Sequence, residues 1–217
     1  MLVCAFALLT LASYCTSSKM MEELEQSINK ARSNPKHYKE MLSMLYISKG
    51  IYGTSNDKYC YMEALKYLDQ REPLPELEPN AVARLVSSRH SKYMKENSVF
   101  SHYETVRRSL KERLEEVGEW EEKYAYGEVI GYSYAKLSTD VQVMEWIAGC
   151  GVLVRGDRSN IFNSKYKTIG CAAYDRYTTC IFTKPIHLKP ELPPQLLQEL
   201  NSAQSAQSAQ STQTSSP

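Results

Sequence analysis

The stretch Glu145–Cys171 restricts the fold more than any other part of the sequence, because it joins the end of a helix near Trp146 to a strand that begins near Lys167. The residues between them predict an irregular loop, whose backbone would be satisfied by the side chains of Asp157, Ser159 and Asn160. Large apolar residues at its ends, Trp146, Ile161 and Phe162, are expected to hold it against the core. A polar loop on a rigid core is a typical position for functional groups.

The first 18 residues resemble a secretory signal peptide. They carry no charged side chain, Leu2–Ala12 is an apolar run, and small residues follow it. The run is too short to span a bilayer, and no later segment is a candidate transmembrane helix. The alternative is an uncleaved core helix. We expect a secreted, extracellular chain that begins near Thr16.

Cleavage after Cys15 would leave Cys60, Cys150, Cys171 and Cys180, an even set that suits disulfides in an oxidising compartment. A cut before Cys15 would leave an odd thiol. The net charge is +1 and acidic and basic residues alternate, so the sequence has no footprint for nucleic acid or for an anionic membrane.

Apolar periodicity predicts helices in the first part of the chain and a mixture of helices and strands later. The expected helices cover Met20–Ala31, Pro35–Leu45, a segment from an Asp57 cap to Leu68, Pro79–Glu96, Val106–Val117, and a segment from Ser138 or Thr139 to Trp146. The expected strands are Tyr126–Ser133, Lys167–Tyr174 and Tyr177–Thr183. This order predicts an α+β domain over residues 19–188. Residues 189–217 are expected to be a proline-rich and then Ser/Ala/Gln-rich disordered tail.

The last two strands predict a hairpin. If Asp175-Arg176 is a two-residue turn, Cys171 lies opposite Cys180 in a non-hydrogen-bonded pair, whose short separation suits a disulfide. By elimination Cys60 would pair with Cys150. Asp-Arg is a poor two-residue turn, so a shifted register is the alternative.

Several blocks together resemble the CAP superfamily (cysteine-rich secretory, antigen 5 and pathogenesis-related proteins), and more closely its SCP-like bacterial and protist branch. These blocks are Ala31–Pro35 with Tyr38, Glu63–Leu68 with Pro73-Leu74 and Leu77, the helix leading to His102, Gly127-Glu128, Glu145–Ile147, Arg155–Phe162 and Ile169-Gly170. The resemblance implies a three-layer α-β-α sandwich. It also implies a cleft in which two histidines and acidic residues can bind a divalent metal.

By position, His102 resembles the first histidine of that cleft and Glu128 its glutamate, whereas Asp157 stands where this branch has the second histidine. Val129 replaces an asparagine and Gly149-Cys150 replace an acidic pair, so a two-histidine zinc site is not expected. His102, Glu128 and Asp157 remain candidate oxygen-rich ligands for a weakly held divalent cation. The alternative is a remnant in which Arg155 or Arg158 holds Asp157.

Other signals are given less weight. Arg155-Gly156-Asp157 spells an integrin-adhesion tripeptide, and Cys150 with His102 resembles a nucleophile pair. The resemblance implies a non-enzymatic protein that binds a lipid or sterol, a metal or an extracellular partner, with no other cofactor. The alternative function is a hydrolase or protease that uses His102 and Glu128, although no nucleophile is evident.

Overall fold

The computed structural model describes residues 19–49, 55–105, 108–121, 125–133, 137–152, 154–194 and 196. The expected signal peptide and the Ser/Ala/Gln repeats lie outside these ranges. Within them, no helix combines the length and the apolar character needed to cross a membrane.

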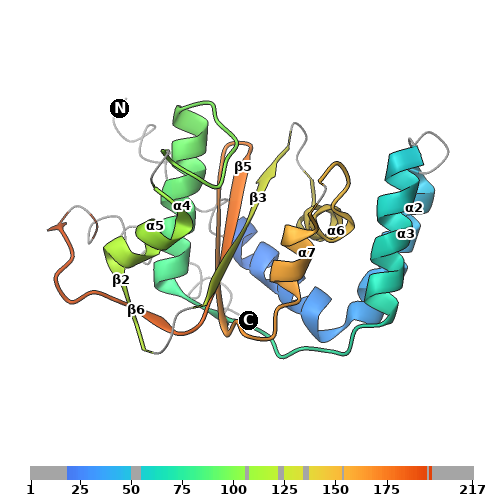
Figure 1. Cartoon of the computed structure of the whole chain (residues 1–217), viewed down its shortest axis with the longest axis horizontal. Helices are drawn as coiled ribbons and strands as arrows, with labels where there is room; N and C mark the ends of the chain where they lie inside the picture. Colours follow the sequence, from blue (N-terminus) through green and yellow to red (C-terminus); the bar gives the residue numbers. More distant parts are fainter. Residues whose placement is uncertain are drawn as a thin grey trace, which may run out of the picture.

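The centre of the molecule is a four-stranded sheet in the order β1-β4-β5-β3. It consists of β3 (Tyr126–Tyr132), β4 (Thr168–Tyr174), β5 (Tyr177–Thr183) and the short β1 (Glu78–Pro79). Strands β3, β4 and β5 are antiparallel neighbours, and β1 runs parallel to β4. Strand β3 is therefore an edge of the sheet (Figure 1).

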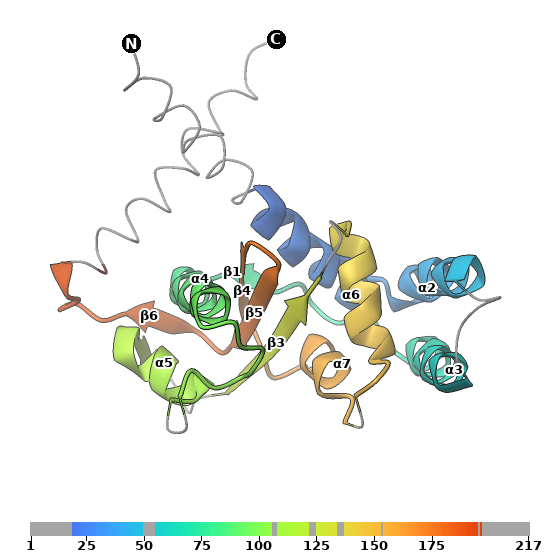
Figure 2. The same ribbon diagram turned by 90° about the horizontal axis from the view of Figure 1, so that it is seen from above.

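One face of the sheet is covered by α4 (Ala81–Glu96), beside which lies α5 (Leu110–Val117) (Figure 2). Helix α4 begins after Asn80, whose side chain accepts a hydrogen bond from the Ala83 amide. Pro79, which we expected to open this helix, instead ends β1. Helix α5 begins later than its apolar period predicted, because Ser109 and Glu112 form a capping box that fixes its start.

The other face is covered by a helix over residues 19–33, by α6 (Thr139–Ala148) and by α7 (Gly156–Ile161), while α2 (Pro35–Lys49) and α3 (Ser55–Asp69) pack together outside them (Figure 2). The chain thus has the expected three-layer α-β-α architecture. Consecutive residues of β5 face the two helical layers in turn. Ile181 packs in the core beneath α4, and Phe182 packs in the core on the opposite face of the sheet.

Helix α7 corrects the prediction of a continuous loop after α6, since Gly156–Ile161 is helical. Trp146, Ile161 and Phe162 are buried as expected, so the segment is held against the core. Its local pattern is too short to give a detectable helical period.

A second, two-stranded sheet was not predicted: β2 (Gly118–Trp120) pairs with β6 (Ile186–Leu188). Leu192 and Leu196 are buried in the same core cluster as Ile186. The packed part of the chain therefore extends past Leu188, where the domain was expected to end.

The hairpin has the predicted register, with Tyr174 opposite Tyr177 and Cys171 opposite Cys180. Asp175 takes a positive φ of 55° in the turn, a conformation that aspartate tolerates better than most residues. The Cα atoms of Cys171 and Cys180 are 4.1 Å apart, as in a non-hydrogen-bonded pair, and the two residues form a disulfide.

Candidate functional site

Side chains from the segment after β3 protect the edge of this strand. Three alternate carbonyl oxygens of β3 each accept a side-chain hydrogen bond at 2.9–3.0 Å: Tyr166 binds Tyr126, Asn160 binds Glu128, and Trp146 binds Ile130. These bonds satisfy carbonyls that an unprotected edge would offer to another strand. The segment Glu145–Cys171 therefore covers the β3 edge of the sheet and fixes the position of Glu128.

The approach of this segment requires glycine at position 127. A Cβ atom on Gly127 would lie 2.4 Å from Asn160 Oδ1 and 2.5 Å from the Tyr166 hydroxyl oxygen. Both atoms belong to side chains that bind β3, so neither can move without loss of a hydrogen bond. Gly127 thus allows Asn160 and Tyr166 to approach the β3 backbone closely, directly before the residue that carries the carboxylate, Glu128.

The Glu128 carboxylate is the centre of the site. Its side chain is 3% exposed and receives charged partners on both oxygens. Arg113 Nη2 lies 2.9 Å from Oε1, and His102 Nδ1 lies 2.8 Å from Oε2. The same Arg113 nitrogen donates to the His102 carbonyl oxygen at 3.0 Å, so helix α5, strand β3 and the loop after α4 are joined at one point.

Arg113 itself is almost fully buried, and its Nε and Nη1 atoms have no hydrogen-bond partner in the described part of the chain. A buried guanidinium tolerates this only beside a compensating charge, here Glu128.

His90 and Glu104 belong to the same network, although no spacing in the sequence would select them. His90 is completely buried; its Nε2 lies 2.9 Å from the Ser101 carbonyl oxygen and its Nδ1 lies 3.4 Å from Glu104 Oε1. A carbonyl only accepts, so Nε2 donates the hydrogen bond to Ser101. Arg108 Nε contacts the other oxygen of Glu104 at 3.1 Å.

Burial alone would raise the pKa of Glu104. The hydrogen bond from His90 and the charges of Arg108 and Arg113 nevertheless lower this pKa below its ordinary value. The carboxylates of Glu104 and Glu128 thus both lie in a buried site and pair with cations of α5 and the loop before it.

His102 is the accessible member of the network, with a side chain that is 51% exposed. The hydrogen bond to Glu128 raises the pKa of His102, partly opposed by burial and supported by the charges of Glu128 and Asp157. The imidazolium form is therefore more stable than in a free histidine. Its Nε2 has no hydrogen bond to any residue that the structure describes, so it can donate to a ligand.

Asp157 lies at the start of α7, near enough to His102 for their charges to interact. Burial raises the pKa of Asp157 to about 6, and the charge of His102 opposes this rise.

The expected pairing of Asp157 with Arg155 or Arg158 is wrong, because both arginines turn to Glu63 of α3. Their contacts with Glu63 measure 2.9 Å and 3.1 Å. They also donate to carbonyl oxygens at the end of α6, from Arg155 to Gly149 and from Arg158 to Ile147 and Ala148. These roles are structural. Because Arg155 is engaged and Gly156 begins a helix, the tripeptide also lacks a free, extended arginine for adhesion.

The residues present do not fit a divalent metal. Among the described residues, no group of three or more histidine, cysteine or acidic side chains is arranged to hold a cation. Both oxygens of Glu128 are already bound, one of them by a guanidinium whose charge opposes a cation. His102 interacts with both acidic candidates instead: it is hydrogen-bonded to Glu128 and interacts with the charge of Asp157.

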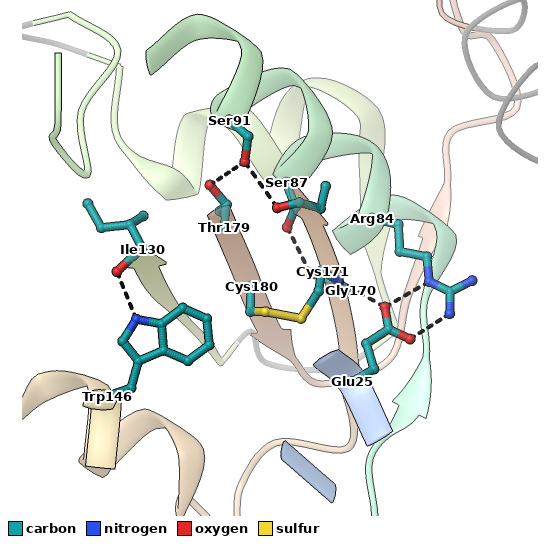
Figure 3. Close-up of a disulfide and its surroundings, with 11 residues drawn as sticks. Glu25, Arg84, Ser87, Ser91, Ile130, Trp146, Gly170, Cys171, Thr179 and Cys180 are labelled. Carbon is teal, nitrogen blue, oxygen red and sulfur yellow. Dashed lines mark hydrogen bonds and ion pairs between the residues drawn. A yellow bond between two sulfur atoms is a disulfide. The ribbon is translucent and has the colours of Figure 1, made fainter. Parts of the chain in front are cut away.

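The cysteines of the described residues form disulfides. Cys60 of α3 is bonded to Cys150 in the loop after α6, which excludes Cys150 as a nucleophile beside His102. Figure 3 shows the second bridge, Cys171–Cys180, inside the sheet. Near it, Glu25 accepts from the Cys171 amide at 2.9 Å and pairs with Arg84.

A three-layer sandwich with this strand order, and with a His–Glu pair beside a protected sheet edge, is the architecture of an SCP-type domain. The profile of the cysteine-rich secretory protein family, CAP, matches residues 25–182, and the chain belongs to this family. A comparison with curated proteins gave no match.

Three of the solved structures that resemble this chain are bacterial proteins. An extracellular SCP-domain protein of Bacillus anthracis is 25% identical, with a TM-score of 0.43, over 60% of this chain and 40% of that one. An outer surface protein of Borrelia burgdorferi is 17% identical, with a TM-score of 0.41, over 61% and 95%. A cysteine-rich secretory protein of Staphylococcus aureus is 16% identical, with a TM-score of 0.31, over 63% and 40%. This chain thus spans less than half of two of these proteins.

Proposed function

We propose that this CAP protein is an extracellular binding protein that uses the surface at His102 and does not catalyse a reaction. The observation that carries the proposal is the 2.8 Å hydrogen bond from His102 Nδ1 to the buried Glu128. This bond raises the pKa of His102 and fixes its ring, so that the second ring nitrogen, Nε2, remains for a hydrogen bond to a ligand.

A cysteine nucleophile for a hydrolase is also not available among the described residues. Cys60, Cys150, Cys171 and Cys180 are all in disulfides. Binding requires only that His102 Nε2 and the Asp157 carboxyl meet complementary groups on a ligand.

A substrate panel tests the absence of catalysis. Wild-type protein, His102→Ala and His187→Ala would be incubated with nitrophenyl esters and fluorogenic peptides. His187 is the matched control, because its side chain is 64% exposed on β6, outside the site. We expect the same background rate from all three proteins. Turnover that disappears only in His102→Ala would establish the hydrolase alternative.

Secretion is part of the proposal. Both disulfides support an oxidising compartment, and the apolar start of the sequence supports export. N-terminal sequencing of the exported product should give a chain that begins near Thr16. A product that retains Leu2–Ala12 would contradict the signal peptide.

A further inference from the structure

A pocket of about 420 Å³ is lined by residues that precede and follow His102 in its loop, and the proposed function has not used this pocket so far. It opens to solvent between the end of α4 and the loop that follows. Its lining residues are Tyr93, Val99, Ser101, Tyr103, Glu104 and Thr105. This volume lies within the range of roughly 300–1,000 Å³ of small-molecule sites.

The position of the loop is fixed, so the pocket is preformed. Helix α4 ends with hydrogen bonds from the Ser98 amide to the Lys95 carbonyl and from the Val99 amide to the Met94 carbonyl. This C-terminal motif sets the direction in which the chain leaves the helix. Phe100 then packs edge-on against Tyr132 of β3, with ring centroids 6.3 Å apart, and holds the loop against the sheet.

The wall of the pocket combines exposed rings with a buried acceptor. Tyr103 is 57% exposed, and Tyr93 stacks on the ring of His90 at 6.4 Å. Glu104 is 7% exposed; among the described residues one of its oxygens contacts His90 and the other contacts Arg108, so each has a second acceptor position that no described residue uses.

This combination restricts the ligand. A ligand that displaces water from the Glu104 carboxylate and from the hydroxyls of the lining must replace the lost hydrogen bonds. An organic cation would find the charge of Glu104 already balanced by Arg108 at 3.1 Å. A neutral ligand with a flat apolar face and a rim of hydroxyl groups satisfies both the rings and the acceptors.

We propose that this pocket binds a neutral sugar ring of an extracellular glycan, stacked on Tyr103 and hydrogen-bonded to Glu104. The inference rests on the proposed binding function and gives it a ligand class. His102, which lies between Ser101 and Tyr103 in the same loop, is placed to contact the next unit of an oligosaccharide.

Titration calorimetry with cellotriose, chitotriose and maltotriose tests the inference on the full mature chain. At least one trisaccharide should bind saturably below about 10 mM, a range that corresponds to weak single-site affinity. Tyr103→Ala should weaken this binding about tenfold or more, and Tyr103→Phe should keep it within about twofold, since the ring is retained. Tyr59→Ala, which removes a 69% exposed tyrosine on α3, is the control and should leave binding unchanged.

The outcomes separate the two proposals. Absence of saturable binding to all three trisaccharides, or equal loss in Tyr59→Ala, would overturn the sugar pocket. Binding of tetramethylammonium that depends on Tyr103, without sugar binding, would do the same. Sugar binding lost in His102→Ala but intact in Tyr103→Ala would reject this pocket and keep the proposed function. Turnover in the substrate panel would reject the proposed function itself.

Discussion

Arg113 and Glu128 form an ion pair of 2.9 Å in which the side chains are only 2% and 3% exposed. Two charges with so little access to water are stable only together, because each supplies the compensation that water would otherwise give. Since Glu128 also binds His102, the orientation of this exposed histidine depends on Arg113, a buried residue of α5.

Arg113→Met should therefore destabilise the fold by about 3–5 kcal/mol, because it leaves the buried Glu128 carboxylate without its guanidinium partner. Chemical denaturation followed by circular dichroism measures the free energy of unfolding. The double variant Arg113→Met/Glu128→Gln should lose less than the sum of the two single losses, since the charges are then removed together.

The matched control is Lys92→Met, because Lys92 pairs with Glu96 at 3.8 Å with both side chains more than half exposed. We expect a change below about 1 kcal/mol. If Arg113→Met and Lys92→Met have equal effects, the buried pair does not stabilise the site in the way described.

Asp157→Asn should stabilise the protein at neutral pH and have little effect at pH 4. The folded pKa of Asp157 is raised to about 6 from 3.8, so the folded state binds the proton more tightly than the unfolded state does. Its contribution to stability is complete below about pH 4 and is lost as the pH rises to about 6. Asparagine keeps the neutral form at every pH, and the gain at pH 7.5 should be about 1–3 kcal/mol.

The pKa of His102 is also raised, so its contribution is complete below its ordinary value of 6.5 and is lost at higher pH. Thermal unfolding of wild type, Asp157→Asn and His102→Ala between pH 4 and 8.5 separates the two windows. A stability difference between Asp157→Asn and wild type that stays constant with pH would show that Asp157 titrates normally.

The sequence predicted the fold where local signals agreed with the tertiary structure. The hairpin register followed from alternation and from a short turn, and it placed Cys171 beside Cys180 correctly. The expected burial of Trp146, Ile161 and Phe162 followed from their size alone. Such burial can be predicted because the hydrophobic effect depends on the apolar area of each side chain and not on its particular neighbours.

The charge network could not be predicted in the same way. His90, Glu104 and Arg113 come together only because α4, its following loop and α5 fold on the same side of the sheet. Their spacing along the chain carries no common period, and His90 looks like any histidine on an amphipathic helix. Similarly, Arg155 and Arg158 were assigned to Asp157 because they are neighbours in sequence, whereas Glu63 comes from a distant helix.

Ser98→Gly should stabilise the loop beside the pocket. Ser98 has a φ of 53° at the end of α4, in the left-handed region that glycine occupies without a steric cost. Relief of this cost, less the extra entropy of glycine in the unfolded chain, should give about 0.5–1 kcal/mol. Thermal unfolding measures the gain. Ser88→Gly, in the interior of α4, is the control and should destabilise instead.

The two disulfides should differ in their contribution to stability. Cys60 and Cys150 are 90 residues apart, whereas Cys171 and Cys180 are separated by 9. The longer loop loses more entropy on closure, so Cys60→Ala/Cys150→Ala should cost about 4–5 kcal/mol and Cys171→Val/Cys180→Val about 2–3 kcal/mol. Valine fills the buried strand positions and limits any cavity. The reverse order in denaturant unfolding would show that packing at the hairpin outweighs the closure entropy.

Wild-type protein should bind zinc poorly, and Asp157→His should bind it more tightly. Zinc prefers nitrogen and sulfur ligands in a tetrahedral arrangement, and His102 Nε2 is the accessible imidazole nitrogen of this site. A histidine at position 157 would supply a second nitrogen from α7, and it would remove a carboxyl whose raised pKa already shows that its charged form is disfavoured. Glu128 cannot join them while Arg113 and His102 occupy both of its oxygens.

Titration calorimetry on wild type, Asp157→His and the double variant Asp157→His/His102→Ala measures this gain. We expect at least about a tenfold tighter affinity in Asp157→His, equivalent to about 1.4 kcal/mol, and its loss in the double variant. Asp175→His, an exposed position in the hairpin turn, controls for a new histidine as such. Tight zinc binding by wild type that His102→Ala abolishes would show that Arg113 does not exclude a cation. If Asp157→His gains nothing, position 157 does not face His102 closely enough to share a ligand.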